Sequence, residues 1–327
     1  MKILVTGATG FVGSALVRKL LSEGHDVRVL VRQKAARLNF NFDGVEQIQG
    51  SLSDLAALEA AVHAQDVVFH VAGVVAAKSR DEFFEANVEG TKNVLAAIQS
   101  KNPEIKKFIF VSSLAASGPC AGDHSRVEGD NPEPVSHYGR SKVEAEEWVK
   151  RSNFPYIIFR PPLVYGPNDR AFFTVIKTVA RGFRPSVMPT QKGVQKTYST
   201  IHIEDLTEAL FKGMNERVTN QIYHVAANEF HTYDEILNEI AKNLGRKTLK
   251  VSVPKTVLKL AAFGLDHVSK LTGKSYPLNR DKLQEIFPDR WTCSNEKLKT
   301  ELDFQPKYEF SDGIRETVDW YRKQGWL

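Results

Sequence analysis

Short apolar runs and amphipathic segments alternate along the first half of the chain. The apolar runs predict strands at residues 2–6, 27–31, 67–71, 107–112 and 156–160. The segments between them have apolar residues at helical spacing and predict helices at residues 12–22, 55–62, 82–99 and 137–150. Strands that are apolar throughout are typical of a parallel sheet that helices cover on both faces. The pattern therefore predicts an α/β fold with a doubly wound parallel sheet.

The alternation weakens after the two prolines at 161–162. Residues 183–200 contain three Pro or Gly residues and show no clear period. Further helices are predicted at 204–214, 233–244, 256–271 and 311–323, with a short strand at 221–225. We expect an N-terminal domain over residues 1–165, whose sheet residues 204–226 rejoin, and a smaller, mostly helical lobe over residues 166–327.

The predicted helix at residues 256–271 is unusually apolar and has lysines near it. Nine of its positions carry apolar side chains. This composition favours a core helix of the small lobe, and a helix that lies on a membrane surface is the alternative. No stretch of the sequence approaches the roughly 20 apolar residues that span a bilayer.

The overall composition is that of an ordinary globular protein, with 42% apolar and 25% charged residues in a chain of 327. The N-terminus enters the first predicted strand directly, without the apolar region of a signal peptide. Cys120 and Cys293 stand far apart and in no metal or redox spacing, which favours a reducing compartment, the cytoplasm. The nine histidines are scattered and predict no metal site.

The net charge is +5, and one segment concentrates basic residues. Between residues 170 and 203 there are six basic residues and no acid, namely Arg170, Lys177, Arg181, Arg184, Lys192 and Lys196. The segment is either a solvated basic face or a surface that attracts an anionic substrate. No nucleic-acid recognition motif accompanies the charge, so we expect a small molecule as partner.

Three glycines separate the first predicted strand from the first predicted helix. Residues 6–13 read TGATGFVG, with Gly7, Gly10 and Gly13. A helix N-terminus offers unpaired N–H groups and a partial positive charge to a phosphate. Gly10 lets the backbone approach the phosphates, and Gly13 lets the helix pack close to the sheet. The spacing G-x-x-G-x-x-G differs from the common G-x-G-x-x-G, but strand, loop and helix together predict a dinucleotide-binding Rossmann domain.

The end of the second predicted strand bears on the choice of cofactor. An acid at this point would bind the ribose 2′-hydroxyl of NAD. The chain instead has Val31 followed by Arg32, with Lys34 and Arg37 nearby. A guanidinium suits a 2′-phosphate, so the sequence favours NADP over NAD. The alternative is that Arg32 is an ordinary surface residue.

A serine, a tyrosine and a lysine are placed for proton transfer. Ser113 ends a predicted strand, at the edge of the sheet where such folds bind ligands. Tyr138 and Lys142 lie four residues apart and so share one face of a predicted helix. A nearby ammonium lowers the pKa of a phenol, which can then exchange a proton with a carbonyl or alcohol that Ser113 holds.

These segments resemble an extended short-chain dehydrogenase/reductase, of the superfamily that contains the nucleotide-sugar epimerases and dehydratases. The matching stretches are TGATGFVG at 6–13, HVAG at 70–73, NVEGTKNVL at 87–95, FVSS at 110–113, YGRSK at 138–142, RPPLVYGP at 160–167 and IHIEDL at 201–206. The resemblance covers nearly the whole chain. Within the superfamily, the chain is similar to the dihydroflavonol reductase and 3β-hydroxysteroid dehydrogenase branches.

The resemblance implies roles for individual residues. Ser113, Tyr138 and Lys142 match the catalytic triad, and Tyr138 and Lys142 also contact the cofactor. The motifs, together with the position of Arg32, give the other expected cofactor contacts, which are Gly7, Thr9, Gly10, Phe11, Val12, Gly13, Arg32, Ser51, Leu52, Ala72, Gly73, Asn87, Pro161 and Leu163. The resemblance also suggests a homodimer through the helix that carries Tyr138.

Two departures from the family pattern affect the expected function. Ser51 stands where the family often has an Asp that holds adenine, and Leu163 stands where many nucleotide-sugar enzymes have an Asn that touches the sugar nucleotide. Together with Arg32 they favour an NADP-dependent reductase or dehydrogenase of a carbonyl/alcohol pair. The alternative is a nucleotide-sugar epimerase or dehydratase with tightly bound NAD, which the basic segment favours. A non-catalytic NADP-binding protein is a third possibility, against which the complete Ser113, Tyr138 and Lys142 set argues.

Overall fold

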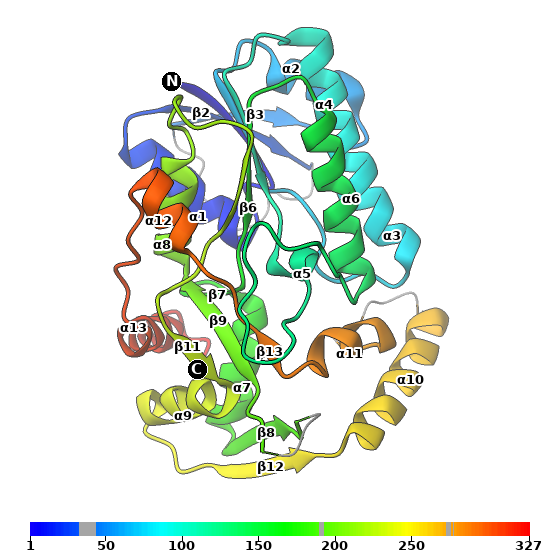
Figure 1. Cartoon of the computed structure of the whole chain (residues 1–327), viewed down its shortest axis with the longest axis vertical. Coiled ribbons are helices and arrows are strands. Elements are labelled where there is room, and N and C mark those ends of the chain that lie inside the picture. Colours follow the sequence, from blue (N-terminus) through cyan, green and yellow to red (C-terminus); the bar gives the residue numbers. More distant parts are fainter. Residues whose placement is uncertain (33–43, 190–192, 273–275, 277) are drawn as a thin grey trace.

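A seven-stranded parallel sheet forms the centre of the fold (Figure 1). In the computed structural model, residues 1–32, 44–189, 193–272, 276 and 278–327 are described. The strands of this sheet are β1 (Lys2–Thr6), β2 (Asp26–Val31), β3 (Val45–Gln49), β4 (Val67–His70), β5 (Lys107–Val111), β6 (Tyr156–Arg160) and β10 (Gln221–His224). Their order is β10-β6-β5-β4-β1-β2-β3, and every neighbouring pair is parallel. The predicted doubly wound α/β fold is confirmed.

Helices cover both faces of this sheet because its strands are apolar on both sides. One face packs on α1 (Phe11–Ser22), α8 (Ile203–Lys212) and α12 (Glu296–Leu302). The other packs on α2 (Leu55–Val62), α4 (Gly90–Lys101) and α6 (His137–Arg151). Successive side chains of β1 alternate between the two cores, with Ile3 and Val5 in the first and Leu4 in the second.

The polypeptide between β4 and α4 departs from the predicted single helix over residues 82–99. Helix α3 (Arg80–Phe84) passes into a π-helical turn, η2 (Glu85–Glu89), before α4 begins at Gly90. The extra residue in a π-helical turn changes the direction of the side chains around it. Asn87 lies in this turn and is buried.

Smaller sheets and helices make up the remaining part, drawn in the lower half of Figure 1. Strand β9 (Thr197–His202) pairs with β7 (Leu163–Tyr165), β11 (Phe230–Thr232) and β13 (Arg290–Trp291). Strand β8 (Phe183–Val187) pairs with β12 (Leu249–Val253). The other helices are α5 (Leu114–Ser117), α7 (Arg170–Ala180), α9 (Tyr233–Leu244), α10 (Lys255–Thr272), α11 (Arg280–Ile286) and α13 (Phe310–Lys323). A third core lies between α7, α9 and α13.

Helix α10 corrects the interpretation of residues 256–271 as a core helix. Ala262 is the one buried residue among the side chains of α10 that the structure describes. Val257, Leu260, Phe263 and Val268 are exposed instead, and Leu258 and Leu265 are half-buried. Among the described elements, α10 packs chiefly on α11. No helix in the described ranges is long and apolar enough to cross a membrane.

Candidate active site

A cleft of about 1200 Å³ opens at the carboxyl ends of the strands of the central sheet. Its wall includes the residues that directly follow β1, β2, β4, β5 and β6. Loops at this edge of an open α/β sheet form the ligand crevice. Every residue that the sequence placed at the site lines this one cleft, namely Gly7, Thr9, Gly10, Phe11, Val12, Gly13, Arg32, Ser51, Leu52, Ala72, Gly73, Asn87, Ser113, Tyr138, Lys142, Pro161 and Leu163.

The glycine loop is packed so closely that no side chain fits at Gly7 or Gly13. Gly7 has φ +73°, and a Cβ there would lie 2.6 Å from the backbone nitrogen of Ala72. A Cβ at Gly13 would collide with the carbonyl oxygen of Gly7, which already accepts the N–H of Gly10 at 3.0 Å. Gly10 caps α1, and no side chain bonds to the first N–H groups of the helix. These N–H groups are therefore available to an anion in the cleft.

Arg32 follows β2 and is exposed at the rim of the cleft. The residue next to it on β2, Val31, also lines the cleft, so the chain has no acid at this strand end. Lys34 and Arg37 lie outside the described residues. On the neighbouring loop, the Ser51 hydroxyl lies 2.8 Å from the Ser53 hydroxyl, at the position where the family often has an Asp.

Ser113 and Tyr138 meet inside the cleft. Ser113 caps α5, with its hydroxyl accepting the Ala115 N–H at 3.1 Å. Tyr138 lies in the first turn of α6, whose N-cap is Ser136. Burial raises the pKa of Tyr138 to about 12, and a hydrogen bond with the Ser113 side chain acts against this rise. The phenol therefore holds its proton at neutral pH.

Lys142 lies one turn after Tyr138 and is anchored from the sheet. Its Nζ donates to the carbonyl of Val111 at 2.7 Å and lies 4.1 Å from the centre of the Phe110 ring. Burial lowers the pKa of Lys142 to about 7, against the opposing charge of Glu146. The expectation that this ammonium lowers the pKa of the phenol is wrong. Burial raises the pKa of Tyr138 and lowers the pKa of Lys142, and in both cases it outweighs the neighbouring groups that oppose the shift.

The lowered pKa makes the contribution of Lys142 to stability dependent on pH. The unfolded chain binds this proton up to a pKa of 10.5 and the folded chain only up to about 7. Stability from this site therefore rises with pH between those values. We expect Lys142→Met to gain most in free energy of unfolding, relative to the wild type, at pH 7 and below, with the gain shrinking toward pH 10.5. Urea unfolding across this range measures it, with the exposed Lys101→Met as control, and a difference that does not vary with pH would contradict it.

Asn87 joins three parts of the site. Its side-chain oxygen accepts the Val74 N–H at 2.8 Å, and its nitrogen donates to the Val74 carbonyl at 3.1 Å and to the Ser141 hydroxyl at 2.9 Å. The loop after β4 is thus tied to α6 beside Lys142. Only the resemblance indicated Asn87, because a π-helical turn gives no periodic signal in the sequence.

The basic segment at 170–203 does not line the cleft. None of its described basic side chains, Arg170, Lys177, Arg181, Arg184 and Lys196, is among the residues that form the wall; Lys192 lies outside the described residues. Lys196 is buried, donates to the carbonyls of Ile286, Phe287 and Pro288 at 2.8–2.9 Å, and pairs with Asp289 at 3.1 Å. Its charge stabilises the C-terminal end of α11 instead of a ligand.

The second half of the chain supplies a wall that sequence patterns did not indicate. It comes from Tyr198 on β9, from Lys282, Glu285 and Ile286 on α11, and from Trp291 on β13. Glu285 accepts the Ser136 hydroxyl at 2.5 Å, and the indole N–H of Trp291 donates to the Glu285 carbonyl at 2.9 Å. These contacts hold α11 against the start of α6, beside Tyr138.

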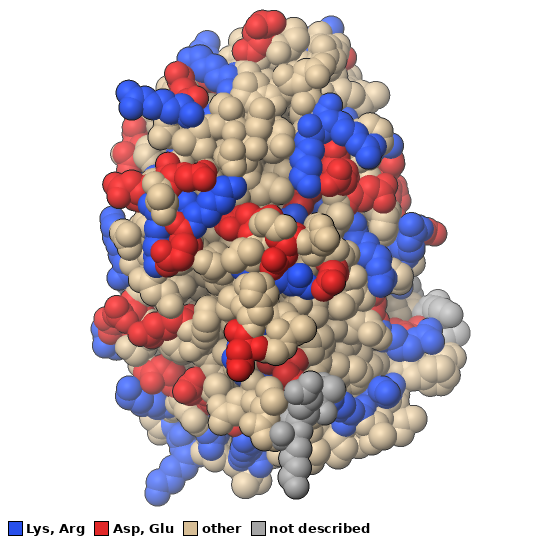
Figure 2. All heavy atoms as spheres, in the orientation of Figure 1, with Lys and Arg blue, Asp and Glu red and all other residues tan. Residues whose placement is uncertain are grey.

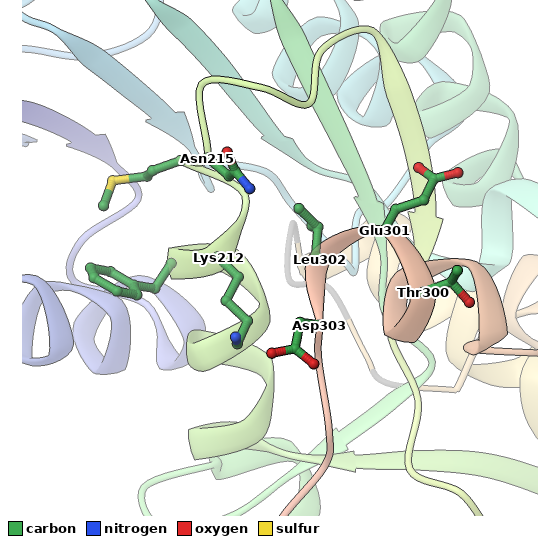
Figure 3. A pocket seen from close by; sticks show the side chains of 8 residues that line it. Lys212, Asn215, Thr300, Glu301, Leu302 and Asp303 are labelled. Atoms are coloured by element: carbon green, nitrogen blue, oxygen red, sulfur yellow. The ribbon is translucent and has the colours of Figure 1, made fainter.

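A separate open hollow of about 490 Å³ lies between the end of α8 and the end of α12 (Figure 3). The side chains of Lys212 and Asp303 point toward each other across it. It shares no lining residue with the cleft. Among the residues that the structure describes, no group of three His, Cys, Asp or Glu side chains is placed to hold a metal.

Comparison with known proteins identifies the family. A family model described as the NAD dependent epimerase/dehydratase family matches residues 3–226. The chain belongs to this family. Its members are extended short-chain reductases, epimerases and dehydratases. Family membership therefore makes the chain an enzyme that uses a nicotinamide dinucleotide.

Two curated relatives of this family member differ in activity. The chain is 29% identical to a ceramide reductase of Caulobacter vibrioides over 326 residues, which cover 99% of this chain and 96% of the relative. It is 30% identical to a UDP-glucose 4-epimerase of Vibrio cholerae over 331 residues, covering 97% and 94%. Among solved structures, a UDP-glucose 4-epimerase of Thermus thermophilus in complex with NAD has the same fold, with a TM-score of 0.76, 24% identity and coverage of 98% and 99%.

Proposed function

We propose that the chain is an NADP(H)-dependent reductase that interconverts a carbonyl and an alcohol in a substrate with an apolar body. One observation carries this proposal. Ser113 and Tyr138 line the same cleft as the glycine loop, and the wall added by the second half contributes the apolar side chains of Ile286 and Trp291 to a cleft that Leu163 also lines. Such a wall suits a hydrophobic substrate better than a sugar diphosphate.

The loop around Gly7 and Gly13 fits a dinucleotide. A Cβ at Gly7 would collide with the backbone of Ala72, and a Cβ at Gly13 would collide with the carbonyl oxygen of Gly7. Only glycine at these positions lets the loop pack this closely, as a dinucleotide-binding loop requires. The free N–H groups at the start of α1 would bind the pyrophosphate, and Asn87, Pro161 and Leu163 would lie beside the nicotinamide end. When bound, the nicotinamide would supply or accept the hydride.

Tyr138 is the proton donor in the proposed reduction. Its raised pKa keeps the phenol protonated, so that it can donate to a carbonyl oxygen as negative charge develops there. Ser113 would hold the same oxygen by a second hydrogen bond. Lys142, held by the Val111 carbonyl, would bond to the nicotinamide ribose and place positive charge near the phenol once the site is filled.

Arg32 supports NADP as the preferred form of the cofactor. It is exposed, its neighbour at the end of β2 is Val31, and a guanidinium binds phosphate through two parallel hydrogen bonds. The Thermus relative in structure carries NAD, so the 2′-phosphate contact is the point at which this chain would differ.

Replacing Arg32 by Glu is expected to reverse the cofactor preference. Loss of a charge-assisted pair should weaken NADPH binding about 10- to 100-fold, and the new carboxylate should accept the 2′-hydroxyl of NADH. Titration calorimetry with both cofactors measures the ratio of the two dissociation constants. Arg170→Glu is the control, since Arg170 is exposed and lies outside the cleft wall. Equal affinity of the unmodified chain for NADPH and NADH would refute the role of Arg32.

A second candidate is a nucleotide-sugar epimerase with tightly bound NAD. The 30% identity to the Vibrio epimerase favours it. The basic segment no longer supports it, because its described basic side chains do not line the cleft. Leu163 also lacks the amide that many nucleotide-sugar enzymes have at this position.

We propose that two parts of the chain bind the cofactor and the substrate separately. Residues 1–165, with 204–226, would bind the dinucleotide, since β10 pairs with β6 at the edge of the central sheet. Residues 166–327 would receive the substrate, since α11, β9 and β13 form the added wall. Cys120 and Cys293 are both free thiols, which agrees with the reducing cytoplasm as the site of action.

The proposal is tested by incubating the purified chain with NADPH and one of two substrates. A long-chain 3-ketone in detergent micelles represents the apolar class, and UDP-glucose represents the sugar class. We expect steady oxidation of NADPH with the ketone only. Conversion of UDP-glucose to its 4-epimer without net use of cofactor would favour the second candidate.

A further inference from the structure

An exposed apolar surface extends over the end of the molecule formed by β8, β12 and α10. We call this the basal surface and define it by residues 183–187 and 245–272; it lies at the bottom of Figure 1. Strands β8 and β12 are paired, and α10 begins directly after Pro254 at the end of β12. Its exposed large apolar residues are Phe183, Leu249, Val251, Val257, Leu260, Phe263 and Val268. Exposed apolar side chains that gather at one end of a molecule are typical of an interaction site.

Helix α10 turns an apolar stripe away from the protein. Val257, Leu260 and Val268 are 51%, 73% and 40% exposed. In a helix of about 3.6 residues per turn, these three positions lie within about 80° of one another, opposite the buried Ala262. The stripe is therefore a second apolar face, separate from the one that packs on α11.

Basic residues outnumber acids on this surface. Residues 183–187 and 245–272 contain seven basic residues, which are Arg184, Arg246, Lys247, Lys250, Lys255, Lys259 and Lys270. Their one acid is Asp266, which pairs with Arg280 of α11. Lys250 is paired with Asp234 of α9, whereas Arg246 and Lys247 are exposed beside it. Figure 2 shows blue and tan spheres along the lower edge, with red spheres gathered higher up.

We propose that the basal surface docks onto an anionic lipid bilayer. Large apolar side chains on one face of a helix, with Lys and Arg around them, are what an interfacial helix needs to enter the headgroup region. The basic residues are attracted by acidic headgroups. Helix α10 would then lie in the plane of the interface, with its apolar stripe in the headgroup region.

The basal surface is connected to the wall of the cleft through α11. Helix α10 packs on α11, and α11 carries Lys282, Glu285 and Ile286 in the cleft wall. Arg280 at the start of α11 pairs with Asp266 of α10 at 2.6 Å, which fixes the two helices together. The inference goes beyond the proposed function and does not depend on it, because adsorption to vesicles requires neither cofactor nor turnover.

The test is co-sedimentation of the full chain with two kinds of vesicle. One is pure phosphatidylcholine, and the other contains phosphatidylglycerol in addition. We expect binding to the anionic vesicles, and a loss of about tenfold or more in partitioning for Leu260→Gln/Phe263→Gln and for Arg246→Glu/Lys247→Glu. Leu55→Gln on α2 is the control, since Leu55 is exposed on another part of the molecule.

Each outcome decides the proposal. Binding to anionic vesicles that both double variants lose and Leu55→Gln retains supports it. Absence of binding to anionic vesicles, or equal binding by all variants, overturns it. Light scattering on the same samples identifies the other occupant of such a face: a dimer that Leu260→Gln/Phe263→Gln converts to a monomer, without vesicle binding, would assign the surface to a second copy of the chain.

Discussion

Replacing Tyr138 by Phe is expected to lower kcat by about 100- to 10,000-fold, the usual effect of losing a positioned proton donor. The substitution removes only the hydroxyl, so the ring keeps its contact with Phe83, 6.0 Å away between ring centres. The dissociation constant of NADPH should stay within about twofold, because the hydroxyl acts on the substrate. Steady-state kinetics and a cofactor titration on the same preparation measure both quantities.

Tyr156→Phe is the matched control for this prediction. Tyr156 is partly buried on β6, and it does not line the cleft. Its variant should retain the activity of the unmodified chain. Unchanged kcat in Tyr138→Phe would remove Tyr138 from the proton transfer, whatever cofactor the chain uses.

Replacing Glu146 by Ala is expected to give the largest loss of stability, about 3–5 kcal/mol in the free energy of unfolding. Glu146 is fully buried and accepts two hydrogen bonds from Arg160, from Nε at 2.9 Å and from Nη2 at 2.5 Å. The hydroxyl of Ser112 also donates to Glu146. Removing the carboxylate leaves the charge of Arg160 buried without its partner, which is the costly change. Urea unfolding at neutral pH measures it.

Two further variants separate this effect from a general disturbance of α6. Glu144→Ala, on the same helix but exposed, should change stability by about 0.5 kcal/mol or less. The double variant Glu146→Met/Arg160→Met removes both charges and should recover much of the loss. A double variant as unstable as Glu146→Ala would show that the pair itself, and not the unpaired Arg160, accounts for the energy.

The central sheet was predictable because its strands are uniformly apolar. The predicted runs at 2–6, 27–31 and 156–160 agree with β1, β2 and β6 to within one residue at each end. Strand β3 was missed, since it is an edge strand of mostly exposed residues, Val45–Gln49, and has no apolar run. Sequence patterns predict buried strands, but they miss an exposed edge strand such as β3, which is extended because it pairs with β2.

The second half of the chain was less predictable because its roles depend on tertiary contacts. Helix α10 has the composition of a core helix, yet nothing in the sequence reveals that the protein leaves one of its faces uncovered. Lys196 belongs to a basic segment, but it is buried against the carbonyls at the end of α11, about 90 residues away in sequence. Trp291 and Glu285 reach the cleft through packing that no motif encodes.

The candidate site was also predictable only in part. Motifs indicated the glycine loop, Ser113, Tyr138 and Lys142, and the structure brings them into one cleft. Their electrostatics could not be read from spacing. The pKa of Tyr138 is raised and that of Lys142 lowered because both are buried, and burial appears only once the chain is folded.

The most direct test of the account is to follow one deuterium atom. The chain is incubated with NADPH deuterated on the reactive face of C4 and with a long-chain 3-ketone, and the product is analysed by mass spectrometry. The account predicts an alcohol that carries the deuterium on its carbinol carbon, formed in equal amount to NADP⁺, and almost no product with Tyr138→Phe. A product without deuterium, or a cofactor that stays bound and returns to its starting oxidation state while a nucleotide sugar is epimerised, would contradict it.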